Sequence, residues 1–426
     1  MQAIVHPARR LEGEFMVPGS KSHTIRGIVI ASLAEGKSTL IKPLQSADTQ
    51  AAVNACRSLG ASINCEDDRW EIAGFGHMPA TPGKKLNLMN SGTSLNLVAG
   101  IAALAPQETI LDGDFSLRSR PVQPLLDALN QLGAKAVSLK NNGCPPISVR
   151  GTLSGGKATV NGLSSQFVSS LLIATPLASK DTELIVTNLN EVPYVEMTLA
   201  WLVEQGISCE RNDDFTHFSI KGNQRYHPFQ KVIPGDWSTA TFPLVAATLI
   251  DSDVSICGLD PDDAQGDRMV VKYLQEMGAR IEVKKKSIRI QGGCKLRGVH
   301  LDLNRTPDAL PALAVIACAA EGKTVLDNVA HARIKETDRI SVMASQLRKM
   351  GARVEEKRDG LIIYQSRLKG TVVDGHHDHR VVMALTLAGL KAEGLTVVST
   401  AEAAGVTFPG FFAMLQQLGA KVELKE

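Results

Sequence analysis

A pattern of apolar and polar residues recurs six times along the 426-residue chain. In each copy an amphipathic stretch with helical spacing ends at a glycine and is followed by an alternating, strand-like segment. The copies read CRSLGASI, LNQLGAKAV, LVEQGISC, LQEMGARI, LRKMGARV and LQQLGAKV, and their glycines lie 73, 73, 72, 73 and 68 residues apart. Because glycine suits the left-handed position after a helix end, each copy predicts a helix, a glycine cap and a strand.

A second kind of helix precedes each of these segments and is apolar on nearly every face. The runs are IVIASLA, LNLVAGIAAL, VSSLLIATPLA, TFPLVAATL, LPALAVIACAA and VVMALTLAGL. Helices that are apolar all round belong in a protein interior. We therefore predict an α/β (α+β) fold of six βαβαββ-like repeats, three per domain, with these helices buried and the sheets outside.

The domain boundary is expected in the segment QRYHPFQKVIPG, residues 224–235, between the third and fourth repeats. The sixth repeat is shorter than the others, and the strand-like N-terminal segment MQAIVHPA can complete it. We therefore predict an N-terminal domain of residues 14–229 and a C-terminal domain of residues 230–426 plus 1–13. The active site is expected in the cleft between the two domains.

Polar and small residues gather at the starts of the apolar helices, which read PGSKSHTIRG, NSGTS, SSQF, PGDWSTA, TPDA and HDHR. Helix N-termini carry unpaired N–H groups and a partial positive charge. Serine, threonine, aspartate and asparagine are ordinary N-caps, so any single start could be a cap and nothing more. Lys21, Arg26 and Arg380 lie in the same turns, however, which favours an anion-binding site where such helix starts converge.

Composition limits the class of protein. Lys and Arg total 46 against 44 Asp and Glu, so the net charge of +2 gives no reason to expect a nucleic-acid partner or an anionic membrane. The longest apolar run is about half the roughly 20 residues that span a bilayer, and the N-terminus lacks the apolar core of a signal peptide. The seven cysteines are scattered and form no CxxC pair. We expect a cytoplasmic protein without disulfides or a metal site.

The motifs together resemble one known family. PGSKS followed by Arg26, NSGTS, the RP pair at 120–121, SSQF, PGD, PDA, KETDR and HDHR resemble the 5-enolpyruvylshikimate-3-phosphate synthase family, in that family's order. The resemblance implies the two-domain enolpyruvyl transferase fold. It also implies transfer of the enolpyruvyl group of phosphoenolpyruvate to the 5-hydroxyl of shikimate 3-phosphate, with release of phosphate, in the shikimate pathway to chorismate and aromatic amino acids. A monomer that uses no cofactor is expected.

The resemblance also implies roles for the residues at matching positions. The implied catalytic residues are Asp308, Glu336, Lys21 and Lys335, with Asp308 the base at the attacking hydroxyl. The implied ligands of shikimate 3-phosphate are Lys21, Ser22, Arg26, Ser164, Ser165, Gln166, Tyr194, Asp308, His331 and Lys335. The implied ligands of phosphoenolpyruvate are Lys21, Asn90, Gly92, Arg120, Gln166, Arg339 and Arg380. Guanidinium groups suit this task because they bind carboxylate and phosphate with two parallel hydrogen bonds.

Four positions depart from the family pattern and keep other functions open. Asn96 replaces a usual arginine, Glu191 a common phosphate-binding serine, His331 a usual Asn or Glu, and Val406 a lysine that some members have. One alternative is an enolpyruvyl transferase that acts on another phosphorylated hydroxyl compound. Another is an anion-binding relative without catalysis. The sister enzyme that uses UDP-N-acetylglucosamine is disfavoured, because its catalytic cysteine has no counterpart in GDFSLRSRP.

Overall fold

The computed structural model describes residues 1–285 and 287–426. The chain divides into two compact units, which we call the N-terminal unit, Gly19–Ile233, and the C-terminal unit, Met1–Pro18 with Pro234–Glu426. The two boundaries between the units, after Pro18 and after Ile233, lie a few residues later in the chain than the predicted boundaries after residues 13 and 229. Strand β2 (Arg10–Met16) pairs in parallel with β15 (Asp251–Cys257) and so lies in the C-terminal unit. Strand β14 (Gln230–Val232) pairs with β3 (Lys37–Ile41) and so lies in the N-terminal unit.

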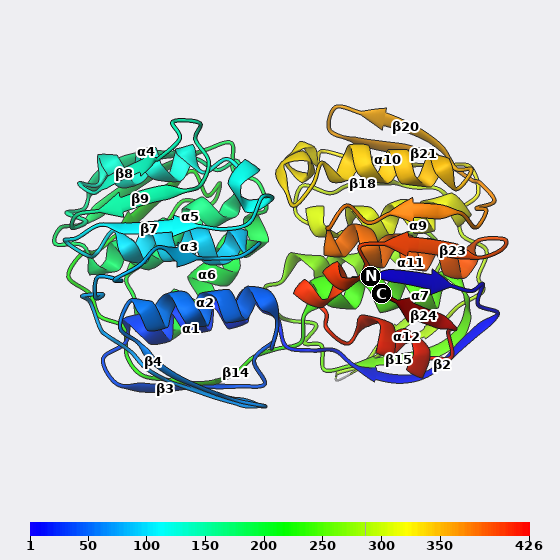
Figure 1. Ribbon diagram of the computed structural model, residues 1–426, viewed down its shortest axis with the longest axis horizontal. Coiled ribbons are helices and arrows are strands. Elements are labelled where there is room, and N and C mark those ends of the chain that lie inside the picture. Colours follow the sequence, from blue (N-terminus) through cyan, green and yellow to red (C-terminus); the bar gives the residue numbers. More distant parts are fainter. Residues whose placement is uncertain (286) are drawn as a thin grey trace. The chain divides into compact units, whose positions relative to one another are not determined.

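The N-terminal unit alternates helices and strands through three repeats (Figure 1). Its helices are α1 (Lys21–Leu33), α2 (Ala47–Ser58), α3 (Gly92–Ala102), α4 (Gln123–Gln131), α5 (Ser165–Ala174) and α6 (Val192–Glu204), with 3-10 turns at η1 (Leu117–Ser119) and η2 (Thr175–Leu177). Its strands are β3, β4 (Ser62–Glu66), β5 (Arg69–Ala73), β6 (Leu86–Asn87), β7 (Thr109–Asp112), β8 (Lys135–Ser138), β9 (Ile147–Arg150), β10 (Gly156–Asn161), β11 (Thr182–Thr187), β12 (Cys209–Arg211), β13 (His217–Ile220) and β14.

The C-terminal unit repeats the same plan and contains both chain termini (Figure 1). Its helices are α7 (Trp237–Leu249), α8 (Met269–Glu276), α9 (Leu310–Ala319), α10 (Arg339–Lys349), α11 (His379–Lys391) and α12 (Phe411–Gln417), with 3-10 turns at η3 (Gly266–Arg268), η4 (Pro307–Ala309), η5 (Ala330–Ile334) and η6 (Ala401–Val406). Its strands are β1 (Gln2–Val5), β2, β15, β16 (Arg280–Val283), β17 (Ser287–Gln291), β18 (His300–Asp302), β19 (Lys323–Asp327), β20 (Arg353–Lys357), β21 (Gly360–Tyr364), β22 (Val372–Asp374), β23 (Thr396–Ser399) and β24 (Val422–Lys425).

Within the described residues, the strands form six four-stranded mixed sheets. The sheet β10-β11-β13-β12 shows the plan: β10 and β11 run parallel, joined through α5, and β12 and β13 form an antiparallel hairpin beside β11. In the sixth sheet the N-terminal strand β1 lies between β23 and β24 and is antiparallel to both. The predicted α/β class with six repeats of strands and helices, three in each unit, is confirmed.

The predicted glycine caps account for the recurring helix ends. Six glycines, one in each repeat, all have positive φ, between 68° and 111°: Gly60, Gly133, Gly206, Gly278, Gly351 and Gly419. The residue after each glycine donates its N–H to a carbonyl five positions earlier, as Ala61 does to Cys56 and Ala352 to Leu347. This is the Schellman bond, and its left-handed step is one that glycine takes without steric cost.

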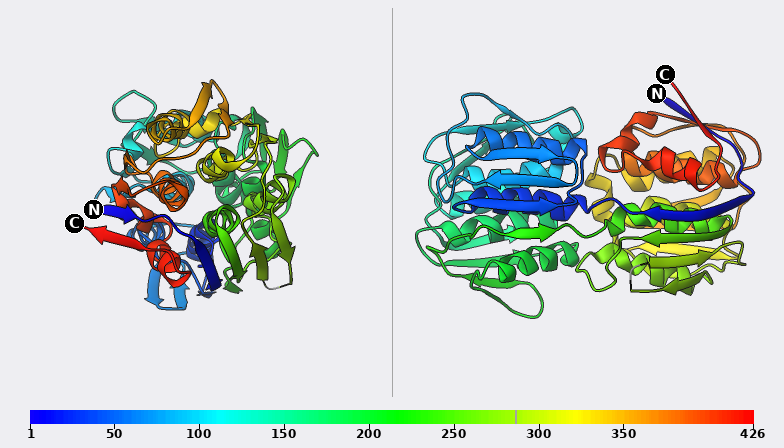
Figure 2. Two further views of the ribbon diagram at one scale, coloured as in Figure 1. Left: turned by 90° about the vertical axis from the view of Figure 1, so that its right-hand side faces the viewer. Right: turned by 90° about the horizontal axis from the view of Figure 1, so that it is seen from below.

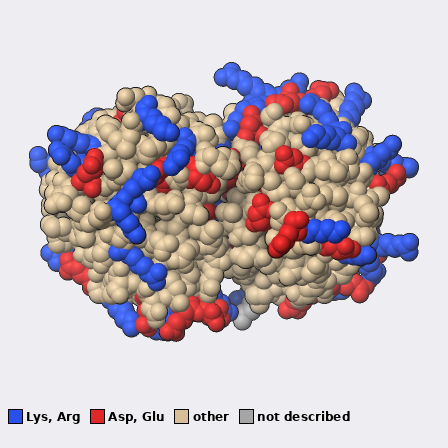
Figure 3. Space-filling view, in the orientation of Figure 1, with Lys and Arg blue, Asp and Glu red and all other residues tan. Residues whose placement is uncertain are grey.

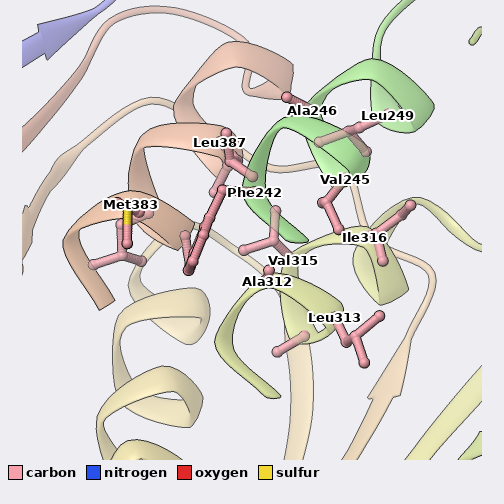
Figure 4. Close-up of a cluster of buried hydrophobic side chains, with 14 of the residues drawn as sticks. Phe242, Val245, Ala246, Leu249, Ala312, Leu313, Val315, Ile316, Met383 and Leu387 are labelled. Atoms are coloured by element: carbon pink, nitrogen blue, oxygen red, sulfur yellow. The ribbon is translucent and has the colours of Figure 1, made fainter. Parts of the chain in front are cut away.

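The apolar helices form the interior of each unit, as predicted. Every residue of α7 is buried, and α7, α9 and α11 pack on one another. Figure 2 (left) looks roughly along these three helices, with strands around them. Figure 4 shows where they meet, with Phe242, Ala312 and Met383 each contributed by a different helix. The buried hydroxyl of Thr248 donates to the carbonyl four residues earlier, so this polar group is satisfied within its own helix.

The chain as a whole carries a net charge of only +2. On the face drawn in Figure 3, acidic and basic side chains are interspersed and separated by broad uncharged areas. This matches the near balance of 46 basic and 44 acidic residues. No helix in the described part of the chain has the length and apolar character needed to cross a membrane.

Candidate active site

Helix α1 positions the first two predicted cations in the N-terminal unit. Ser20 caps the helix by accepting the N–H of His23. Lys21 follows, and its Nζ lies 3.0 Å from Oδ2 of Asp48, in the first turn of α2. Sequence reasoning missed Asp48, since nothing local in QSADTQ distinguishes it from an ordinary first-turn acid.

Arg26, one turn further along α1, is a deeply buried cation with only 1% of its surface exposed. Its guanidinium donates to Thr198 Oγ1 at 2.9 Å, Ser169 Oγ at 3.2 Å and the Tyr194 carbonyl at 3.0 Å. Burial lowers the pKa of Arg26 to about 10, so the group stays charged at neutral pH. All its hydrogen-bond partners in the described structure are neutral, which makes this a place where an anion would be stabilised.

A second group of predicted residues surrounds the start of α3. Asn90 Oδ1 accepts from Arg120 Nη2 at 2.6 Å. Gln166 donates from Nε2 to Thr93 Oγ1 at 3.2 Å, which links α5 to α3. A Cβ on Gly92 would lie 2.9 Å from Arg120 Nη1 and 3.7 Å from Gln166 Oε1. The structure therefore brings Asn90, Gly92, Arg120 and Gln166 together, and glycine leaves the guanidinium its room.

The start of α5 places the two predicted serines in different environments. Ser164 is half-buried, and its side chain caps the helix by accepting the N–H of Gln166 at 3.4 Å. Ser165 is 1% exposed and donates its hydroxyl to Glu191 Oε2 at 2.7 Å. The carbonyl of Tyr194 accepts from Arg26, so Tyr194 lies beside the buried guanidinium.

In the C-terminal unit the predicted residues gather around Arg339, which begins α10 and is 1% exposed. Its guanidinium contacts three carboxylates: Asp308 at 2.8 Å, Glu336 at 2.5 Å and Asp378 at 2.8 Å. Arg380 Nη2 lies 2.9 Å from the second oxygen of Asp308. One carboxylate therefore bridges the two arginines that were predicted to bind phosphoenolpyruvate.

The charges of this cluster settle the protonation state of Asp308. Burial alone would raise the pKa of Asp308, but Arg380, Arg339 and Lys335 together hold it well below its usual range. Asp308 is therefore an ionised carboxylate at neutral pH, the form that a general base needs. Lys335 and Glu336 are half-buried beside it, and His331 is buried in η5.

Two acids of this unit were missed by sequence reasoning. Asp378 caps α11 by accepting the N–H of Arg380 at 2.9 Å, and it also holds Arg339. Asp267, in η3, is 3% exposed and accepts the hydroxyl of Ser238. Asp378 is part of the HDHR motif. Nothing in the sequence links Asp267 to Ser238, which lies 29 residues away at the start of α7.

Comparison with known proteins identifies the family. The family model described as EPSP synthase (3-phosphoshikimate 1-carboxyvinyltransferase) matches residues 5–415. The chain belongs to the EPSP synthase family. The resemblance drawn from the motifs is thereby confirmed.

Relatives of the EPSP synthase family match the chain along nearly its full length. The 3-phosphoshikimate 1-carboxyvinyltransferase of Acetivibrio thermocellus is 51% identical and covers 98% of this chain and 98% of its own. That of Methanocaldococcus jannaschii is 43% identical, with 99% of each chain covered. A solved EPSP synthase from Acinetobacter baumannii superposes with a TM-score of 0.83 at 29% identity, covering 100% of both chains.

The positions that depart from the EPSP synthase pattern have definite places in the structure. Asn96 donates from Nδ2 to Gln166 Oε1 at 2.7 Å and so helps to orient that glutamine. Glu191 is buried against Ser165. His331 is buried, with 4% of its surface exposed, and Val406 is half-buried at the end of η6. The predicted site residues remain predictions as substrate ligands.

The pKa of Asp267 gives a pH-dependent prediction. Burial raises this pKa most, the charge of Asp308 raises it further, and the result is about 7 against an ordinary 3.8. The folded chain therefore keeps a proton that the unfolded chain loses, so stability falls as pH rises from about 4 to about 7. Thermal unfolding of Asp267→Asn should show a gain in Tm over the parent chain that is larger at pH 8 than at pH 5. An equal gain at both pH values would contradict this pKa.

Proposed function

We propose that the chain transfers the enolpyruvyl group of phosphoenolpyruvate to the 5-hydroxyl of shikimate 3-phosphate and releases phosphate. The observation that carries this function is the 51% identity, over 98% of both chains, to a protein named 3-phosphoshikimate 1-carboxyvinyltransferase. The reaction adds the hydroxyl oxygen to C2 of phosphoenolpyruvate and a proton to C3. The tetrahedral adduct then loses phosphate from C2 and a proton from C3.

Phosphoenolpyruvate is proposed to bind to Arg120 and Lys21 of the N-terminal unit and to Arg339 and Arg380 of the C-terminal unit. Its carboxylate and phosphate each suit a planar guanidinium. Support comes from the carboxylate of Asp308, which forms ion pairs with both Arg339 and Arg380. The substrate anion would replace the Asp308 carboxylate as the partner of these arginines. Little of their charge is therefore uncompensated, with or without bound substrate.

The acceptor is proposed to bind mainly at the starts of α1 and α5. Arg26 and Ser22 would hold the shikimate carboxylate, which is supported by the neutral surroundings of the Arg26 guanidinium. Ser164, Ser165 and Gln166 would face its phosphate, with Tyr194 nearby. His331 and Lys335 of the C-terminal unit would complete the acceptor site.

Asp308 is proposed to accept the proton of the attacking hydroxyl. Its low pKa keeps it ionised in the chain as described, because two guanidinium groups hold it. When the substrate takes over those guanidinium groups, the carboxylate loses its stabilising partners and becomes more basic. Lys335 and Glu336 would then carry the proton to and from C3 of the enolpyruvyl group.

Because the proposed ligands come from both units, we further propose that they act in one site between the units, which closes on the substrates. The chain is proposed to work as a monomer in the cytoplasm. Small-angle scattering should show a smaller radius of gyration when shikimate 3-phosphate is added. An unchanged radius would contradict closure.

The function is tested by mixing the purified chain with shikimate 3-phosphate and phosphoenolpyruvate and measuring phosphate release. Mass spectrometry of the same mixture should detect 5-enolpyruvylshikimate 3-phosphate. Release only with another phosphorylated hydroxyl compound would favour an altered acceptor. Binding without release from any acceptor would favour an anion-binding relative without catalysis.

A further inference from the structure

The N-terminus of α5 holds an internal carboxylate that comes from another helix. Glu191 Oε2 accepts the backbone N–H of Ser165 at 3.3 Å and the Ser165 hydroxyl at 2.7 Å. The Glu191 residue is 2% exposed. A helix N-terminus favours negative charge, so this carboxylate fills part of the place where α5 would bind an anion.

The backbone around Glu191 is arranged to deliver the carboxylate to α5. Glu191 is the N-cap residue of α6, but its side chain makes no capping hydrogen bond to α6. Its φ of 57° and ψ of 41° lie in the left-handed region, which is uncommon for a residue with a Cβ. The side chain therefore serves the neighbouring helix instead of its own.

The three apolar helices of the N-terminal unit all begin with a serine cap, which is Ser164 in α5. Helices α1 and α3 are capped by the hydroxyls of Ser20 and Ser91, which belong to the same chain segment as the helix. All residues of α1, α3 and α5 are described, and their first turns contain no acid. The start of α5 thus receives from α6 a carboxyl group that its own sequence does not supply.

We propose that Glu191 determines specificity at the phosphate subsite of the acceptor, by competing with the acceptor's phosphate for the N-terminus of α5. This proposal rests on the proposed function, which places that phosphate at Ser164 and Ser165. The Ser165 hydroxyl is committed to Glu191, so the half-buried Ser164 is the serine left to face the phosphate. The carboxylate lowers the affinity for a phosphorylated acceptor because like charges meet in a partly buried site.

Glu191→Gln tests the proposal because it removes the charge and keeps the shape and an accepting oxygen. Calorimetric titration of the intact chain with shikimate 3-phosphate should give a Kd about tenfold lower than that of the parent chain. Titration with shikimate, which lacks the phosphate, should change by less than twofold. In turnover, the KM of phosphoenolpyruvate and kcat should also change by less than twofold.

Glu204→Gln is the matched control, because it removes the same charge from the exposed last residue of the same helix. It should leave every one of these values within twofold. If Glu191→Gln does not fold, Glu191→Asn replaces it with the same expectations, because asparagine also removes the charge and tolerates the left-handed backbone. An unchanged or higher Kd for shikimate 3-phosphate would overturn the proposal. So would an equal gain in affinity for shikimate, since the effect would then not depend on the phosphate.

The titrations do not depend on turnover, so the two proposals fail separately. A parent chain that binds shikimate 3-phosphate but forms no product contradicts the proposed function and leaves the comparison of Kd values decisive. A parent chain that forms product, together with an unaltered Kd in Glu191→Gln, contradicts the role of Glu191 alone.

Discussion

Arg339→Met should destabilise the C-terminal unit by about 3–5 kcal/mol and abolish enolpyruvyl transfer. The arginine is 1% exposed and contacts Asp308, Glu336 and Asp378, so its loss leaves three carboxylates close together with one cation fewer. Little solvent reaches these carboxylates to screen their mutual repulsion. Thermal and urea unfolding measure the first effect, and phosphate release measures the second.

The pH dependence of this variant identifies the cause. Protonation relieves crowded carboxylates, so the loss of stability in Arg339→Met should be smaller at pH 5 than at pH 8. Arg289→Met is the control, since Arg289 makes an exposed bidentate pair with Asp253 in the same unit. Such exposed pairs contribute about 0–1 kcal/mol. A loss below 1 kcal/mol in Arg339→Met would mean that the cluster is not held together by this guanidinium.

The repeating architecture could be predicted from the sequence because its determinants are local. A glycine with positive φ ends each amphipathic helix, and an apolar run makes each buried helix, whatever the rest of the chain does. The boundaries of the units were harder to predict, because they depend on which strands pair. Strand β2 pairs with β15, where Arg10 lies opposite Asp251, and β14 pairs with β3, where Gln230 lies opposite Thr39. These pairings join segments far apart in the sequence, so the chain crosses between units later than composition indicates.

Several contacts made by acids of the candidate site could not be predicted from the sequence. Folding brings Asp48 to Lys21, which is 27 residues away in the chain, and Asp267 to Ser238, which is 29 residues away. Neither acid belongs to a motif that would have singled it out. The sequence shows that Glu191 departs from the family pattern, but it does not show where the Glu191 side chain points. Only the structure shows that its carboxylate turns onto Ser165.

These acids share one physical role. Asp48 holds Lys21, Asp308 holds Arg339 and Arg380, and Glu191 occupies the start of α5. Buried cations are costly without a counter-charge, and the proposed substrates supply that charge only while they are bound. The internal carboxylates therefore stabilise the chain without substrates, and a substrate anion that binds at one of these three places would displace the carboxylate there. Arg26 is different, because its hydrogen-bond partners are neutral.

Asp308→Asn separates these two roles of Asp308. Asparagine keeps the shape of aspartate but cannot accept the hydroxyl proton, so kcat should fall by about 10²–10⁴-fold. The same substitution removes the carboxylate that competes for Arg339 and Arg380, so the KM of phosphoenolpyruvate should stay equal or fall. Steady-state kinetics with both substrates measure the two effects, and circular dichroism checks the fold.

Asp302→Asn is the matched control for Asp308→Asn, because Asp302 is an exposed acid at the end of β18 in the same unit. Its kcat should remain within twofold of the parent value. If Asp308→Asn kept more than a tenth of kcat, the base would have to be another group near the reacting hydroxyl. Glu336 would then be the first to examine, since Arg339 holds it in the same cluster. A large rise in the KM of phosphoenolpyruvate would instead mean that Asp308 positions the two arginines and does not compete with the substrate for them.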